Sequence, residues 1–143
     1  MIKLLFKTIP SSPYSLGLVS EFVSRFPPFD DFEFRRMVQT LLYQLETGNH
    51  AAAGLDDRIV GYVGWIKTTH AIAEAWMSHD VELHAAISDV DAIAVTVLAT
   101  EHSRYMLPLI KHAKMLNAGY SVYWKRHLPD GRTAVKRSVR KKS

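Results

Sequence analysis

A short polar segment, Glu101-His102-Ser103-Arg104, stands between a long apolar run and a segment with helical character. Glutamate and histidine at such a junction could accept or donate a proton. The first N–H groups of a helix have no partner within the helix, so its N-terminus attracts anions, and Arg104 could contact a phosphate there. The segment therefore predicts one site for proton transfer or anion binding. The competing interpretation is an ordinary polar turn in which Glu101 favours the helix dipole.

Asp91 stands at the other end of the apolar run and could orient a histidine, as in a pair of a base and its supporting carboxylate. A solvated carboxylate at a strand edge is the commoner case. His79 and His84 flank Asp80 and Glu82, but this spacing matches no standard set of metal ligands. We therefore expect no metal site.

These positions depend on a buried strand and on the helix that follows it. Residues 91–100 are almost continuously apolar and rich in β-branched side chains, which is typical of a strand buried on both faces. Residues 104–116 have helical character, and this helix is expected to stop at residues 117–119.

The first third of the chain predicts an edge strand and two helices. Residues 1–10 mix lysine with apolar residues, as an edge strand does. Residues 14–26 have helical spacing of apolar side chains, and so does the segment from Asp30 or Asp31 to Gly48. Aspartate is expected to cap the second helix and glycine to end it. Four phenylalanines at the junction of the two helices are expected to pack together: Phe26, Phe29, Phe32 and Phe34.

Two hairpins and two ambiguous segments complete the pattern. The hairpins have their turns at residues 55–58 and 128–132. Residues 68–77 predict a short helix or an ordered loop, and residues 81–87 a helix turn or a strand. The whole order predicts an α+β fold with a mixed, mostly antiparallel sheet flanked by helices.

The composition is that of a globular protein. The chain has 143 residues, of which 48% are hydrophobic and 22% charged, so we expect a single domain over residues 1–143. Cysteine is absent, which excludes disulfides and thiolate metal sites and fits a cytoplasmic location. No apolar run reaches the roughly 18 residues of a membrane span, so no membrane is expected as a partner.

The net charge of +4 is distributed unevenly. Residues 125–143 hold eight Lys or Arg and one acid, whereas residues 1–124 hold ten basic and thirteen acidic residues. The domain is therefore expected to end in a basic hairpin and tail at residues 120–143. One interpretation is a solvated tail, and the other is contact with an acidic partner such as nucleic acid or an acidic carrier protein.

The order of elements resembles that of the GNAT (acyl-CoA N-acyltransferase) superfamily over nearly the whole chain. In that superfamily a central strand leads into a helix whose N-terminus receives the cofactor pyrophosphate. The resemblance implies that Thr100, Ser103, Arg104 and Tyr105 bind the donor, acetyl-CoA or another acyl-CoA.

A narrower resemblance concerns toxin-activating lysine acyltransferases, which use acyl carrier protein as donor. Residues 60–65, Val-Gly-Tyr-Val-Gly-Trp, are similar to that family's Val-Ala-Tyr-x-Ser-Trp segment. Residues 76–78 and 91–94 are similar to its Trp-x-Ser-Gly-Asp and Asp-x-Ile-Ala-Pro segments, so its catalytic aspartate maps to Asp91. Its catalytic histidine lies near the N-terminus, where this chain has none before His50. Another histidine would have to fill that place.

The chain also departs from the general GNAT pattern. The Gln/Arg-x-x-Gly-x-Gly/Ala loop is absent, because residues 101–106 contain no glycine. Glycine lets a backbone approach a pyrophosphate closely, so its absence argues against conventional binding of acetyl-CoA. A carrier-protein donor would depend less on such a loop.

Two hypotheses of function remain. The first is an acyltransferase that moves an acyl group from CoA or acyl carrier protein to an amine, on a small molecule or a protein lysine. Glu101 or His102 would act near the reacting centre, with Asp91 in support. The second is a catalytically inactive GNAT-like binding or structural protein, for example a phage-type component, whose basic C-terminus contacts nucleic acid or a protein. An exposed edge strand at residues 133–139 would allow a homodimer.

Overall fold

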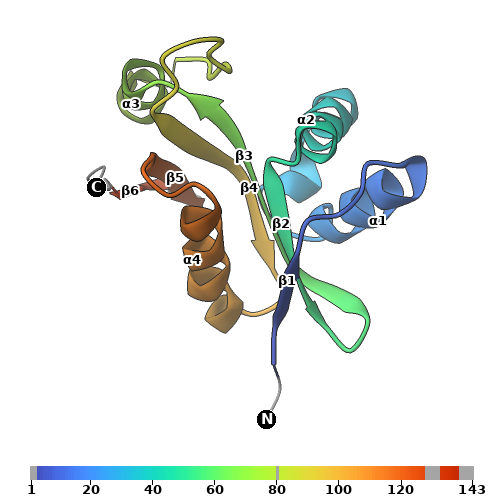
Figure 1. Ribbon diagram of the computed structural model, residues 1–143. Coiled ribbons are helices and arrows are strands. Elements are labelled where there is room, and N and C mark those ends of the chain that lie inside the picture. The colour runs from blue at the N-terminus through green and yellow to red at the C-terminus, as the bar shows by residue number, and fades with distance from the viewer. Residues whose placement is uncertain (1–2, 80, 128–132, 139–143) are drawn as a thin grey trace. The chain divides into compact units, whose positions relative to one another are not determined.

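The computed structural model describes residues 3–79, 81–127 and 133–138 (Figure 1). Six strands form one sheet in chain order. The strands are β1 (Leu5–Lys7), β2 (His50–Leu55), β3 (Arg58–Thr68), β4 (Ala92–Thr100), β5 (Ser121–His127) and β6 (Thr133–Ser138). The helices among the described residues are α1 (Pro13–Val23), α2 (Phe34–Thr47), α3 (His70–His79) and α4 (Met106–Leu116), with 3₁₀ turns η1 (Phe29–Asp31) and η2 (Ser103–Tyr105).

The sheet is mixed and mostly antiparallel. β1 with β2, β2 with β3, and β5 with β6 pair antiparallel, whereas β4 and β5 pair parallel. The α+β class predicted from the sequence is confirmed, and so are the buried strand before residue 101, the helix after it and the two pairs of hairpin strands. The turn of the last hairpin, residues 128–132, and the tail at 139–143 lie outside the described residues.

The chain divides into two compact units. The first unit comprises residues 1–64 and 97–113, and the second comprises residues 65–96 and 114–143. Strands β3 and β4 each begin in one unit and end in the other. The expectation of a single domain over residues 1–143 stays a prediction.

In the first unit, α1 and α2 lie on one side of the strands and α4 on the other (Figure 1). α1 begins where the Ser12 hydroxyl accepts the Ser15 N–H at 3.0 Å, which satisfies one unpaired donor of the first turn. The apolar stripe of α2 is buried through Met37, Leu41 and Leu45. These side chains belong to a core formed with residues of α1 and of strands β2 to β4.

In the second unit, α3 packs against β5. Its buried apolar residues Ala73 and Met77 form a small core with Ala92 and Tyr123, and the ring of Trp76 packs against this core. The helical alternative predicted for residues 68–77 is therefore confirmed.

Three expectations were wrong in detail. Asp30 and Asp31 do not cap α2, because they form η1 and the helix begins at Phe34, after Glu33, whose side chain makes no capping bond. Residues 81–91 form neither helix nor strand. Phe29 is buried as predicted, but the Phe34 side chain is 82% exposed and does not pack.

No helix within the described ranges is long and apolar enough to cross a membrane.

Candidate functional site

The predicted site at the end of β4 lies in the first unit. Thr100 ends the strand, and the Glu101 N–H donates to the Val60 carbonyl at 2.9 Å. Residues 103–105 then form η2, which leads directly into α4. The structure thus brings the predicted donor-binding residues and two of the predicted catalytic residues into one turn.

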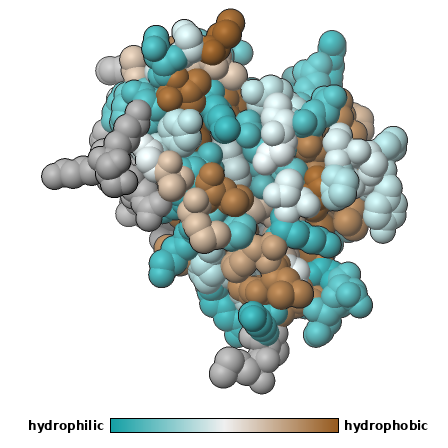
Figure 2. Space-filling view, in the orientation of Figure 1, coloured by the Kyte–Doolittle hydropathy of each residue, from teal (hydrophilic) through white to brown (hydrophobic). Residues whose placement is uncertain are grey.

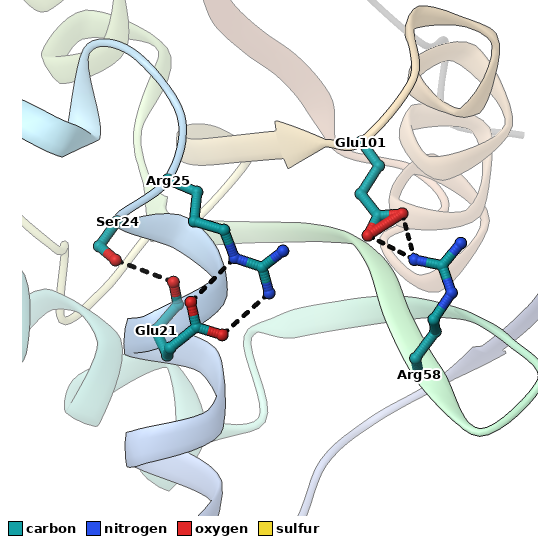
Figure 3. Close-up of polar contacts among 5 residues, drawn as sticks. All are labelled: Glu21, Ser24, Arg25, Arg58 and Glu101. Atoms are coloured by element: carbon teal, nitrogen blue, oxygen red, sulfur yellow. Dashed lines mark hydrogen bonds and ion pairs between the residues drawn. The ribbon is translucent and has the colours of Figure 1, made fainter.

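Glu101 is held by an ion pair across this end of the sheet (Figure 3). Both of its carboxylate oxygens accept from Nη1 of Arg58, the first residue of β3. The Glu101 side chain is 24% exposed, so it is partly shielded from water. The Arg58 guanidinium therefore occupies both oxygens of the carboxylate that a substrate would have to contact.

Two backbone N–H groups of η2 are used within the turn itself. The Arg104 N–H donates to Nδ1 of His102 at 3.2 Å, and the Tyr105 N–H donates to the His102 carbonyl at 3.0 Å. The Arg104 guanidinium lies 5.1 Å from the centre of the Tyr105 ring and donates to its hydroxyl at 3.1 Å.

The turn nonetheless presents side chains of a kind that can bind phosphate oxygens. His102, Ser103 and Arg104 are exposed. A guanidinium and a hydroxyl can hold phosphate oxygens without the close backbone approach that a glycine loop provides.

A cavity of about 410 Å³ adjoins Glu101 in the first unit. Its wall combines apolar side chains with two ion pairs, Glu21–Arg25 on α1 and Arg58–Glu101 (Figure 3). Figure 2 shows hydrophobic surface over strand β1, whose Leu5 is 65% exposed and lines this cavity. The volume lies within the usual range for small-molecule sites.

A second cluster of proton-carrying side chains lies in the second unit, around Asp91. One carboxylate oxygen of Asp91 accepts the backbone N–H of His70 at 2.9 Å, and the other lies 3.9 Å from His70 Nε2. His70 Nδ1 is 2.5 Å from the Tyr123 hydroxyl, and Nε2 is 3.1 Å from the Ser121 hydroxyl.

The His70 ring is therefore oriented on both edges and still reaches solvent. Its side chain is 44% exposed, whereas Ser121 and Tyr123 are buried beneath it. Each hydroxyl can donate or accept, so the ring can take up a proton without leaving a partner unsatisfied. This is the arrangement that a general base requires.

His70 is the functional candidate that the sequence did not single out. It lies 21 residues from Asp91, and no spacing rule links the two. The two residues are brought together at the end of β3. There the Asp91 N–H donates to the Thr68 carbonyl at 3.2 Å, and this bond holds the start of α3 beside the start of β4.

Asp91 and the turn at residues 100–105 stand at opposite ends of β4 and belong to different units. Support of Glu101 or His102 by Asp91 therefore stays a prediction. Within the described part of the chain, no group of three or more His, Asp or Glu side chains is arranged to hold a metal ion.

Comparison with known proteins identifies the fold. No protein-family model matches the chain, and no curated protein matches it by sequence. Solved structures do match. The GNAT-like decarboxylase GphF in complex with isobutyryl-CoA aligns with a TM-score of 0.64 at 14% identity, over 90% of this chain and 67% of that one.

Two further solved structures align similarly well. The mosquito arylalkylamine N-acetyltransferase-like 5b has a TM-score of 0.62 at 10% identity, over 90% of this chain and 79% of that one. The diaminobutyrate acetyltransferase EctA from Paenibacillus lautus, in complex with its substrate and coenzyme A, has a TM-score of 0.60 at 9% identity, over 89% and 68%.

The chain therefore has the GNAT fold. Because a decarboxylase is among the similar structures, the fold by itself does not fix the reaction.

Proposed function

We propose that this chain is an N-acyltransferase that moves an acyl group from an acyl-CoA to the amine of a small molecule. The observation that carries the proposal is the surroundings of His70, a solvent-reaching imidazole oriented by two hydroxyls, with a carboxylate oxygen of Asp91 3.9 Å from its Nε2. Among structures of this fold, several are named as acetyltransferases of small amines. Acyl transfer to an amine needs such a base, because a protonated amine is no nucleophile.

His70 would accept a proton from the incoming ammonium group, directly or through water. Asp91 holds the backbone at the first residue of α3, and its second carboxylate oxygen lies 3.9 Å from Nε2 of the ring. The Tyr123 hydroxyl lies 2.5 Å from Nδ1 and fixes the ring at that edge. The alternative bases are Glu101 and His102, and Glu101 would act only after Arg58 releases its carboxylate.

The acyl-CoA supplies a thioester, in which the carbon–sulfur bond breaks as the carbon–nitrogen bond forms and the thiol leaves with a proton. Binding of the acyl-CoA by Thr100, Ser103, Arg104 and Tyr105 stays a separate prediction, because these residues belong to the first unit and His70 to the second. Cytoplasmic location, a carrier-protein donor and a protein lysine as acceptor remain further predictions.

The test is release of free thiol from acetyl-CoA, a long-chain acyl-CoA and an acylated carrier protein, against a panel of small amines. His70→Gln should lower kcat by about 100-fold or more, the usual contribution of a general base, at a temperature where circular dichroism shows the variant to be folded. Glu101→Gln should cost less than about 10-fold. His84→Gln is the matched control, since His84 is an exposed histidine of the same unit. Equal loss in the His70 and His84 variants would contradict the assignment of the base.

A second function, binding without catalysis, has specific support. Glu101 is occupied by Arg58, and the Arg104 and Tyr105 N–H groups are used within their own turn. A donor that raises the melting temperature but yields no thiol with any amine would favour this second function. Contact of nucleic acid or a protein partner with residues 120–143 would then be the next measurement.

A further inference from the structure

Two large aromatic side chains are exposed where α1 meets α2. The Phe34 side chain is 82% exposed and that of Phe32 is 41% exposed. The edge of one ring faces the other in the Phe29–Phe32 pair, whose centroids are 5.4 Å apart, and Phe29 is buried. Exposed apolar side chains that adjoin one another can mark an interaction site, whereas single ones are ordinary.

These rings surround a cavity of about 330 Å³ in the first unit. Apolar side chains form most of its wall. The lining residues are Ser20, Glu21, Ser24, Phe29, Asp30, Phe32, Phe34, Met37 and Val38. Its size suits one small molecule, at the lower end of the range for ligand pockets.

The charged groups that line the cavity are both acidic. Glu21 shares its carboxylate with Arg25 through two bonds of 2.9 Å on the exposed side of α1 (Figure 3). The Asp30 carboxylate makes no hydrogen bond or ion pair with the described part of the chain. No lysine or arginine is among the lining residues.

We propose that this cavity binds an organic ammonium ion with an apolar body. Aromatic faces attract a cation through their negative quadrupole, and the carboxylate of Asp30 completes the recognition of its charge. An anion would be repelled by the carboxylates of Glu21 and Asp30, and a neutral apolar molecule would make no ion pair with Asp30. Binding here does not depend on acyl transfer, because a dissociation constant can be measured without an acyl donor.

The test uses 2-phenylethylammonium and its neutral counterpart 2-phenylethanol, titrated into the full chain by calorimetry and by amide chemical shifts. The ammonium should bind at least about 5-fold more tightly than the alcohol, because cation–π and ion-pair contacts add to equal apolar burial. Asp30→Asn should remove most of that preference, and Phe34→Ala should weaken ammonium binding about 2- to 5-fold.

Tyr14→Ala is the matched control. Tyr14 is 79% exposed and lines the other cavity, beside Glu101, so its loss should leave binding unchanged. Because Phe34 is also highly exposed, the melting temperature of Phe34→Ala should stay that of the parent chain. Equal affinity for the two probes, no saturation at millimolar concentration, or loss of binding only in Tyr14→Ala would each overturn the proposal.

Discussion

At the scale of single residues, His50 combines full burial with complete hydrogen bonding. Its Nε2 accepts the Ile9 N–H at 2.9 Å, and its Nδ1 donates to the Gln44 carbonyl at 2.9 Å. These two partners require the neutral ring with its proton on Nδ1, because the Ile9 N–H faces Nε2. The histidine thus ties the chain after β1 to the end of α2.

Acid should weaken the fold through this residue. Burial holds the pKa of His50 below its ordinary value of 6.5, so the unfolded chain takes up the proton first. Stability is full above about pH 6.5 and falls as the pH drops through the window below that value. His50→Gln should cost about 1–3 kcal/mol at pH 7.5, since buried backbone groups lose a partner, and should reduce the difference in unfolding free energy between pH 7.5 and pH 5.5.

Urea titrations of the parent chain and the variant at the two pH values measure this effect. Burial also lowers the pKa of His112, so some acid sensitivity should survive in the variant. An undiminished pH dependence would show that His50 does not contribute.

The Arg58–Glu101 pair is expected to matter little for stability. The Arg58 side chain is 59% exposed, and water screens such a pair. Glu101→Gln should change the unfolding free energy by less than about 1 kcal/mol, as measured by urea denaturation at low salt. A larger loss of unfolding free energy would mean that the pair has a structural role. The kcat of Glu101→Gln would then have to be corrected for the fraction of unfolded protein.

At the scale of elements, α2 and β3 meet through a polar contact inside the core. The Tyr62 hydroxyl donates to Oε1 of Gln44 at 2.8 Å, and both side chains are fully buried. Gly64, two residues along β3, leaves room for the Gln44 side chain, because a Cβ atom there would lie 1.8 Å from its Oε1. The glycine is therefore required by this close approach.

Gly64→Ala should destabilise the fold by about 1–3 kcal/mol, the usual cost of overpacking a core. Gly17→Ala is the matched control, since Gly17 lies within α1 and a Cβ atom there meets nothing within 4 Å. It should stabilise by about 0.5–1 kcal/mol through helix propensity. Thermal unfolding of both variants distinguishes the two effects, and a neutral Gly64→Ala would mean that Gln44 can move aside at no cost.

Local sequence patterns predicted most helices and strands. They failed where contacts between distant parts of the chain determine the structure. β4 is buried on both faces, which gives a continuous apolar run, and α2 is buried on one face, which gives an apolar stripe. Both patterns can be recognised in the sequence alone. Asp30 carries an N-cap signal, yet the chain turns through η1 first and starts α2 at Phe34. The contact of His70 with Asp91 depends on how β3, α3 and β4 are arranged, so no periodicity could indicate it.

At the scale of the whole molecule, the two units share strands β3 and β4. Neither unit can lose its sheet without breaking a strand that continues into the other. A shared strand should therefore make the units unfold as one, as small domains usually do.

The tryptophans allow a direct test, because Trp65, Trp76 and Trp124 all belong to the second unit. Leu41→Ala removes a fully buried side chain of the first unit and should cost about 2–5 kcal/mol. For a chain of this size that lowers the melting temperature by about 3 °C per kcal/mol. The melting temperatures followed by tryptophan fluorescence and by far-ultraviolet circular dichroism should fall by the same amount, although no tryptophan lies in the mutated unit. A fluorescence transition that stays at the parent temperature would mean that the second unit is stable without the first.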